Sequence, residues 1–109
     1  MNFPVFDLHC DTAYALLGDD CNSIGSLKKN NLHIDMERAG KLPGYAQCFA
    51  CFTTPLMQQW HNVSPIVAFE RELASIQREI DSNKRKISLA YHASDVKSNI
   101  EKGKASAIL

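Results

Sequence analysis

The sequence lacks an excess of charge of either sign, because 12 Lys and Arg residues balance 12 Asp and Glu residues. There is therefore no global electrostatic reason to expect nucleic acid or an anionic membrane as a partner. It also lacks any stretch near the roughly 18 apolar residues of a membrane span, and it does not begin with the basic start and apolar run of a secretory signal. We expect no membrane span and a cytoplasmic location.

Cysteine, proline and glycine are scarce, at four, four and five residues, which excludes a disulfide-dense scaffold and a collagen-like repeat. Hydrophobic residues make up 45% and charged residues 22%, which is typical of a soluble globular chain. The 109 residues hold at most one domain. They are too few for a complete eight-stranded barrel enzyme, which needs roughly 200 residues.

Several motifs are absent. The sequence has no P-loop, no GxGxxG and no GxSxG, and its basic run at 84–86 has no interleaved aromatic residues and indicates a solvated loop. Cys48 and Cys51 have CxxC spacing, but positions three apart in a strand point to opposite faces, and aromatic neighbours disfavour a thiolate. We expect these cysteines, with Cys10 and Cys21, to be free thiols, most of them in the core. A small redox or zinc module on Cys48 and Cys51 stays open as a third reading.

Apolar segments alternate with helical patterns along the chain. We predict strands at 3–10, 45–52, 87–91 and 105–109. We predict helices at 12–17, at 36–39 after an Asp35 cap, from Pro65 to about 80 after Ser64, and from Ser94 or Asp95 to about 102, with stops at Gly18, Gly40 and Gly103. Turns are expected at 22–26 and 42–44. This order predicts an α/β fold with parallel strands joined by right-handed crossovers.

The long helix has a predicted apolar stripe, with charged residues left for its wet faces. The stripe consists of Ile66, Phe69, Leu73, Ile76 and Ile80, and the wet residues are Glu70, Arg71, Glu72, Arg78 and Glu79. The final strand, at 105–109, stops abruptly, so we expect a truncated chain with open strand edges.

The chemically informative segment is Asp7-Leu8-His9-Cys10-Asp11. In an extended chain Asp7, His9 and Asp11 share one face, and Phe6, Leu8 and Cys10 share the other, which suits packing against helices. Burying the charged forms of Asp7, His9 and Asp11 without partners would cost roughly several kcal/mol for each charge. A divalent cation held by His9 and Asp11, with Asp7 orienting the imidazole from behind, resolves this. The alternative is a turn with a hydrogen-bonded histidine and solvated carboxylates. His33, His61 and His92 show no paired-ligand spacing and are interpreted as ordinary surface or loop residues.

Three blocks together resemble the membrane (renal) dipeptidase family of zinc peptidases. The first is the segment from Phe6 to Thr12, the second runs from His33 to Gly40 and on into the strand from Tyr45 to Ala50, and the third runs from Gly103 to Leu109. The resemblance implies a TIM-type (β/α)8 barrel with a two-zinc site, of which residues 1–109 would be an N-terminal fragment comprising the first β/α units. It implies that His9 and Asp11 are metal ligands and that Asp7 supports them. The other ligands and the substrate-binding residues would follow Leu109, so no catalytic residue is assigned within this chain.

The family hydrolyses dipeptides by a metal-bound hydroxide, so the resemblance implies a zinc-dependent dipeptidase as the full-length parent and an isolated chain that is inactive. The alternative is a non-catalytic assembly module whose open strand edges pair with another copy, which would make a homo-oligomer.

Overall fold

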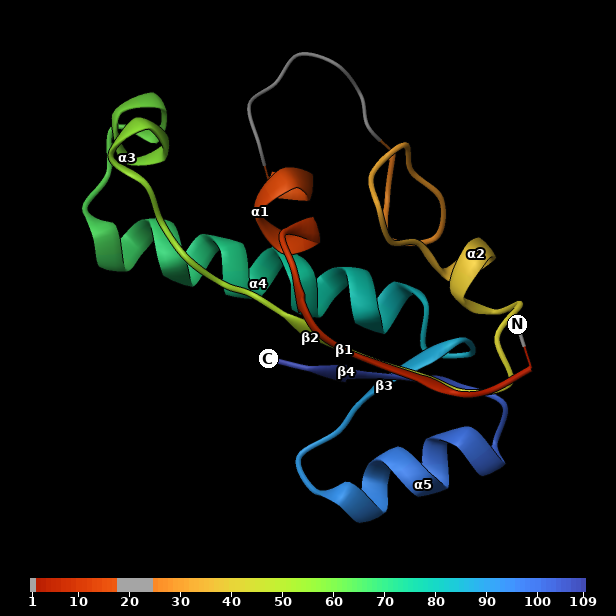
Figure 1. Cartoon of the computed structure of the whole chain (residues 1–109). Helices are drawn as coiled ribbons and strands as arrows, with labels where there is room; N and C mark the ends of the chain where they lie inside the picture. Colours follow the sequence, from red (N-terminus) through yellow and green to blue (C-terminus); the bar gives the residue numbers. More distant parts are fainter. Residues whose placement is uncertain (1, 18–24) are drawn as a thin grey trace.

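Parallel strands and the helices between them make up the part of the chain that the computed structural model describes, residues 2–17 and 25–109 (Figure 1). In chain order the elements are β1 (Val5–Cys10), α1 (Thr12–Leu17), α2 (Met36–Ala39), β2 (Tyr45–Phe49), α3 (Pro55–His61), α4 (Pro65–Ser82), β3 (Ile87–Leu89), α5 (Ala93–Glu101) and β4 (Ala105–Ile108). The predictions for Gly18, Cys21 and the start of the turn at 22–26 lie outside the described residues.

The four strands form an all-parallel sheet in the order β1-β2-β4-β3. The predicted α/β fold with parallel strands is therefore confirmed, and it is consistent with β/α units of a TIM-type barrel. β1 and β2 are neighbours both in the chain and in the sheet, whereas β4 lies between β2 and β3 in the sheet. β1 and β3 are thus the two edges of this sheet.

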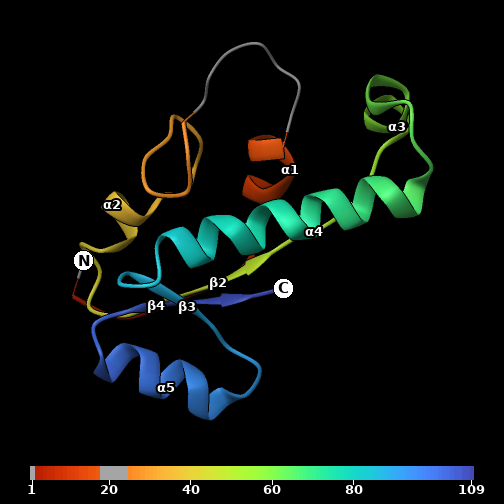
Figure 2. The ribbon, with the colours of Figure 1, turned by 180° about the vertical axis from the view of Figure 1, so that it is seen from behind.

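Helices cover both faces of the sheet (Figures 1 and 2). α1 packs on α4 on one face, and α5 packs against β3 and β4 on the other. The Asn99 side chain of α5 donates a hydrogen bond to Ser106 Oγ of β4 at 3.0 Å, which fixes α5 to the sheet. α5 ends at Glu101, and the predicted stop residue Gly103 follows two positions later with a left-handed φ of 68°. The N–H groups of Gly103 and Lys104 close the last turn by hydrogen bonding to carbonyls of α5.

The predictions missed α3. Thr54 caps this helix by accepting the Met57 N–H at 3.1 Å, and Pro55 occupies its first turn. This is the same start signal as Ser64-Pro65 before α4, but only seven residues follow it, too few for an apolar stripe to show. β2 accordingly ends at Phe49, short of the predicted 52.

The buried face of α4 differs from the predicted stripe. Its buried residues are Ala68, Glu72, Ile76 and Ile80, whereas Ile66 is 61% exposed. The first turns of α4 extend past the carboxyl end of β4, so Ile66 has no sheet to cover it (Figure 1). The assignment of Glu72 to a wet face was wrong, and this residue is fully buried.

The core lies between the sheet and the helices α1, α2 and α4. Its largest members include Leu27, Met36, Tyr45, Phe49, Ile76, Ile80 and Ile87. The basic residues at 84–86 lie exposed in a turn, as predicted. None of the helices in the described ranges is long and apolar enough to cross a membrane.

Candidate metal centre

The end of β1 carries an irregularity that decides where its side chains point. Asp7 pairs with Gln47 and Cys10 pairs with Phe49, so three steps along β1 match two steps along β2. This extra residue acts as a bulge, which re-aims the side chains that follow it. Cys10 therefore shares the face of Asp7 and is buried in the core. Strict alternation had predicted Cys10 on the opposite face, which was wrong.

His9 and Asp11 flank Cys10, and their side chains meet. His9 Nε2 lies 2.7 Å from Asp11 Oδ1, so the predicted convergence of these two groups is confirmed. Asp11 also stands directly before α1, and its carbonyl accepts the Ala15 N–H of this helix at 3.0 Å. The pair therefore stands at the carboxyl end of a parallel strand, where the active sites of α/β proteins form.

The predicted burial of this segment was wrong. The side chains of His9 and Asp11 are 66% and 61% exposed, and Phe6 and Leu8, expected to pack against helices, are 59% and 73% exposed. The physical reason is the position of β1 at the sheet edge. Phe6 is in register with Ala46 and so faces the side of α5, which packs mainly against β3 and β4.

Asp7 contacts the backbone of His9. Its Oδ1 accepts the His9 N–H at 3.2 Å, whereas the sequence predicted a contact with the ring. Across the strand, the Gln47 side chain donates to the Asp7 carbonyl at 3.4 Å and accepts a hydrogen bond from the Tyr45 hydroxyl. Burial, with the charge of Asp7, raises the pKa of Tyr45, so this hydroxyl stays protonated. The network holds the bulged end of β1 against β2.

The pair His9 and Asp11 fits zinc as part of a ligand set. An imidazole nitrogen and a carboxylate oxygen are ordinary zinc ligands, and two ligands of a tetrahedral site lie about 3.4 Å apart. The two atoms need to separate by about 0.7 Å, and both side chains are exposed enough to move. Within residues 2–17 and 25–109, no group of three or more His, Cys, Asp and Glu side chains is placed to hold a metal ion. The described residues therefore contribute two ligands, and a complete site needs more.

A hollow of about 220 Å³ surrounds the pair. Its lining includes Leu32, His33 and Ile34 together with Asp7, His9 and Asp11. His33 lies exposed in a loop, as predicted, and it also contributes to the lining of this hollow. The sequence signal for this was absent, because the approach of the loop to β1 depends on packing across the fold.

Polar contacts hold that loop in place. Asn30 bridges it, because its side chain donates to the carbonyls of Ser26 and Ile34 at 2.8 and 2.9 Å. The buried Asp35 carboxylate accepts hydrogen bonds from the backbone and guanidinium of Arg38. Burial alone would raise the pKa of Asp35, but the Arg38 and Asn30 contacts outweigh it and lower that pKa.

Glu72 of α4 lies buried next to the segment that follows β2. Its Oε2 accepts the Phe52 N–H at 3.3 Å, and its Oε1 has no hydrogen-bond partner among the described residues. Burial raises the pKa of Glu72 to about 7, opposed by the Phe52 hydrogen bond and assisted by the negative charge of Asp11. A signal was available in the sequence, because Glu72 continues the four-residue spacing of Ala68, Ile76 and Ile80.

Cys10, Cys48 and Cys51 are free thiols, as predicted. Cys10 is buried, and the other two are half-buried. Burial raises the pKa of Cys51 to about 11, so its thiol stays protonated at neutral pH. This argues against the redox reading of the CxxC spacing.

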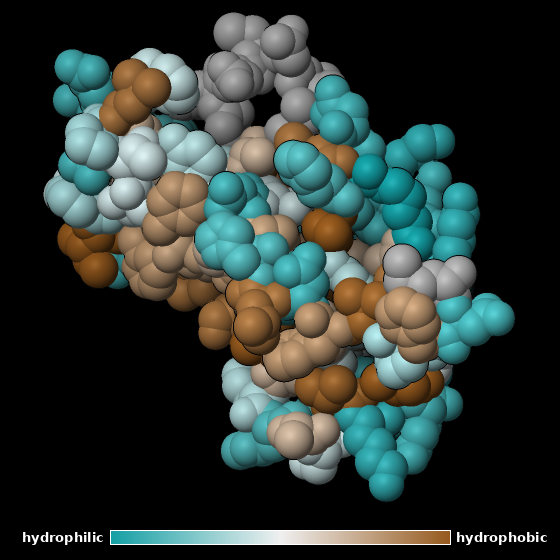
Figure 3. Space-filling model, in the orientation of Figure 1, coloured by the Kyte–Doolittle hydropathy of each residue, from teal (hydrophilic) through white to brown (hydrophobic). Residues whose placement is uncertain are grey.

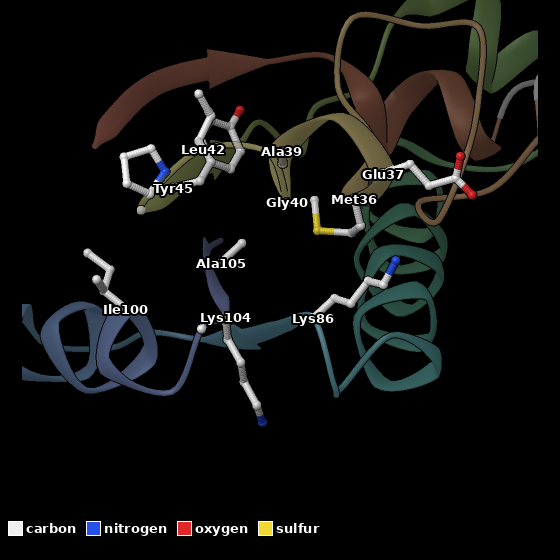
Figure 4. A pocket seen from close by; sticks show the side chains of 13 residues that line it. Met36, Glu37, Ala39, Gly40, Leu42, Tyr45, Lys86, Ile100, Lys104 and Ala105 are labelled. Carbon is white, nitrogen blue, oxygen red and sulfur yellow. The ribbon is translucent and has the colours of Figure 1, made fainter. Parts of the chain in front are cut away.

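A second cavity, of about 200 Å³, lies at the opposite end of the strands (Figure 4). Apolar side chains, among them Met36, Leu42 and Ile100, line it, and Lys104 extends away from it (Figure 4). Because parallel sheets place their chemistry at the carboxyl ends of strands, this cavity is a packing feature of the amino ends. The remaining histidines lie elsewhere, His61 at the end of α3 and His92 just before α5.

Comparison with known proteins gives one family. A search of curated proteins found no match to the chain. The family model described as membrane dipeptidase (peptidase family M19) matches residues 1–109, which is the whole chain. The match includes the segment that brings His9 and Asp11 together at the end of β1. The chain therefore belongs to the membrane dipeptidase family of peptidases.

Proposed function

We propose that residues 1–109 form the N-terminal part of a zinc-dependent dipeptidase in which His9 and Asp11 bind one of two zinc ions. The observation that carries this proposal is the 2.7 Å approach of the His9 imidazole and the Asp11 carboxylate at the end of β1, in a chain of a peptidase family. Asp7 supports the pair by holding the His9 backbone.

The residues of the candidate site have separate tasks in this proposal. His9 offers a ring nitrogen at the end of β1, and Asp11 offers a carboxylate just before α1, so both ligands are anchored to regular structure. Zinc, when bound, would acidify a water molecule and polarise the scissile carbonyl of a dipeptide. The hollow beside the pair, with Leu32 and Ile34 in its lining, offers apolar surface for a substrate side chain. Two ligands alone do not complete a catalytic site, so we expect the isolated chain to be inactive.

The test is dipeptide hydrolysis by the intact protein that carries this chain. His9→Ala and Asp11→Ala should each abolish zinc-dependent turnover, while His92→Ala, at the start of α5, should leave it near the wild-type rate. Full activity of either the His9 or the Asp11 variant would refute the ligand assignment. Turnover of a dipeptide panel by residues 1–109 alone would refute the expected inactivity.

One observation favours a second role, assembly with another copy of the chain. Phe6, Leu8 and Tyr91 are exposed, and a hydrophobic band follows the sheet between its helical layers (Figure 3). A hollow of about 410 Å³ in this region includes Phe6, Tyr91 and Ile108 in its lining. Exposed apolar strand edges promote pairing between chains. Sedimentation of residues 1–109 should show a dimer or larger species that Phe6→Asp converts to monomer, and a monomeric wild-type chain would exclude this role.

A further inference from the structure

α4 carries two glutamates that hold backbone amides of segments bordering the candidate metal centre. Glu72 accepts the Phe52 N–H at 3.3 Å, and Glu79 accepts the Leu27 N–H at 2.7 Å. The two residues are seven positions apart and so lie on one face of the helix. Leu27 begins the segment that carries His33, and Phe52 lies in the segment that follows β2. α4 thus anchors the loop that carries His33 and the segment that follows β2.

Of the two glutamates, Glu72 is the one whose burial is energetically unfavourable. Its side chain is fully buried, and its second oxygen has no partner within the described part of the chain. Burying a carboxylate in this way is unfavourable, and a leucine or methionine would fill the same space without that penalty. Packing therefore does not explain the acid, but its hydrogen bond to the Phe52 amide gives it a defined task.

From Phe52 a chain of contacts leads to the candidate zinc ligand. The Phe52 ring stacks on the Tyr14 ring of α1, with centroids 4.7 Å apart and planes within 8°. The Tyr14 hydroxyl lies 3.0 Å from Thr54 Oγ1, so α1 is held to the same segment twice. Asp11 directly precedes α1, and its carbonyl accepts the Ala15 N–H of this helix. These contacts connect the Phe52 segment, through Tyr14, to the start of α1 beside Asp11.

We propose that Glu72 is a positioning residue of the metal centre, which keeps Asp11 within reach of His9 by fixing the Phe52 amide and, through the Tyr14 stack, the start of α1. This inference rests on the proposed function, because it takes His9 and Asp11 as zinc ligands. Glu72 itself touches neither zinc nor substrate.

The test compares variants of the intact zinc-loaded protein by chelator competition and by hydrogen exchange at the Phe52 amide. Glu72→Leu removes the acceptor and should weaken zinc binding roughly tenfold, at the lower end of the effect of supporting residues in metal sites. It should also speed exchange of the Phe52 N–H. Glu72→Gln keeps an acceptor oxygen and should restore zinc affinity to within about threefold of wild type. Glu70→Leu, at an exposed position of the same helix, should change neither quantity.

The outcomes separate a positioning role from a structural one and from failure of the proposed function. A folded Glu72→Leu protein with wild-type zinc affinity would overturn the inference. If Glu72→Leu does not fold, the Tyr14→Ala variant is used in its place, because it breaks the stack with Phe52 and leaves Glu72 unchanged. Tyr14→Ala should show the same roughly tenfold loss of zinc affinity. His9→Ala is measured alongside. If it leaves zinc binding intact, the proposed function fails, whereas loss in His9→Ala without loss in Glu72→Leu refutes the positioning role alone.

Discussion

Replacing Glu72 by Gln should remove a specific pH dependence from the stability of the chain. The ordinary pKa of a glutamate is 4.5, and burial raises that of Glu72 to about 7 in the folded protein. Between these values the folded state binds the proton more tightly than the unfolded state does. The contribution of Glu72 to the free energy of unfolding is therefore fully present below about pH 4.5, falls as the pH rises through this window, and levels off above about pH 7.

The magnitude follows from the two pKa values. Each pKa unit corresponds to about 1.4 kcal/mol, so ionisation of Glu72 removes about 3 kcal/mol of stability across the window. Glutamine does not titrate, and it retains an oxygen that accepts the Phe52 N–H. The variant should therefore gain up to about 3 kcal/mol over wild type on going from pH 4.5 to pH 7.5.

The assay is urea unfolding of wild type, Glu72→Gln and the exposed control Glu70→Gln at half-unit steps from pH 4.5 to pH 8. The difference in unfolding free energy between Glu72→Gln and wild type should grow with pH, while that for Glu70→Gln stays flat. Parallel stability curves for wild type and Glu72→Gln would refute the reasoning, because they would show that the carboxyl titrates alike in both states.

Two further predictions concern the supports of the site. Asp35→Ala removes the cap of α2 and the buried partner of Arg38. It should lower the free energy of unfolding by about 2 kcal/mol in the same urea assay. A change below about 0.5 kcal/mol would contradict the anchoring role of Asp35. The Cys51 thiol, with a pKa of about 11, should react with iodoacetamide at neutral pH far more slowly than in the urea-unfolded chain, as followed by mass spectrometry. Equal rates in the two states would show that the fold does not suppress its reactivity.

Local signals in the sequence identified most of the elements, and their limits are physical. Asp35, Ser64-Pro65 and Gly103 mark helix ends through backbone geometry that depends on a few neighbouring residues, so they could be read directly. The bulge in β1 could not, because an extra residue in a strand is defined by its pairing with β2. It put Cys10 in the core.

The candidate site was likewise only partly predictable. His9 and Asp11 are two residues apart, so their convergence is a local property and was anticipated. His33 and Glu72 reach this region through long-range packing, His33 on a loop bridged by Asn30 and Glu72 from α4. The four-residue spacing of Glu72 with Ala68 and Ile76 gave a usable signal, but a charged residue on a helix is most simply read as solvated.

The most direct measurement of the central claim is anomalous scattering at the zinc edge from crystals of the intact protein. The account predicts a zinc peak within about 2.2 Å of both His9 Nε2 and an Asp11 carboxylate oxygen. A fully loaded, active protein whose zinc ions lie away from both side chains would contradict it.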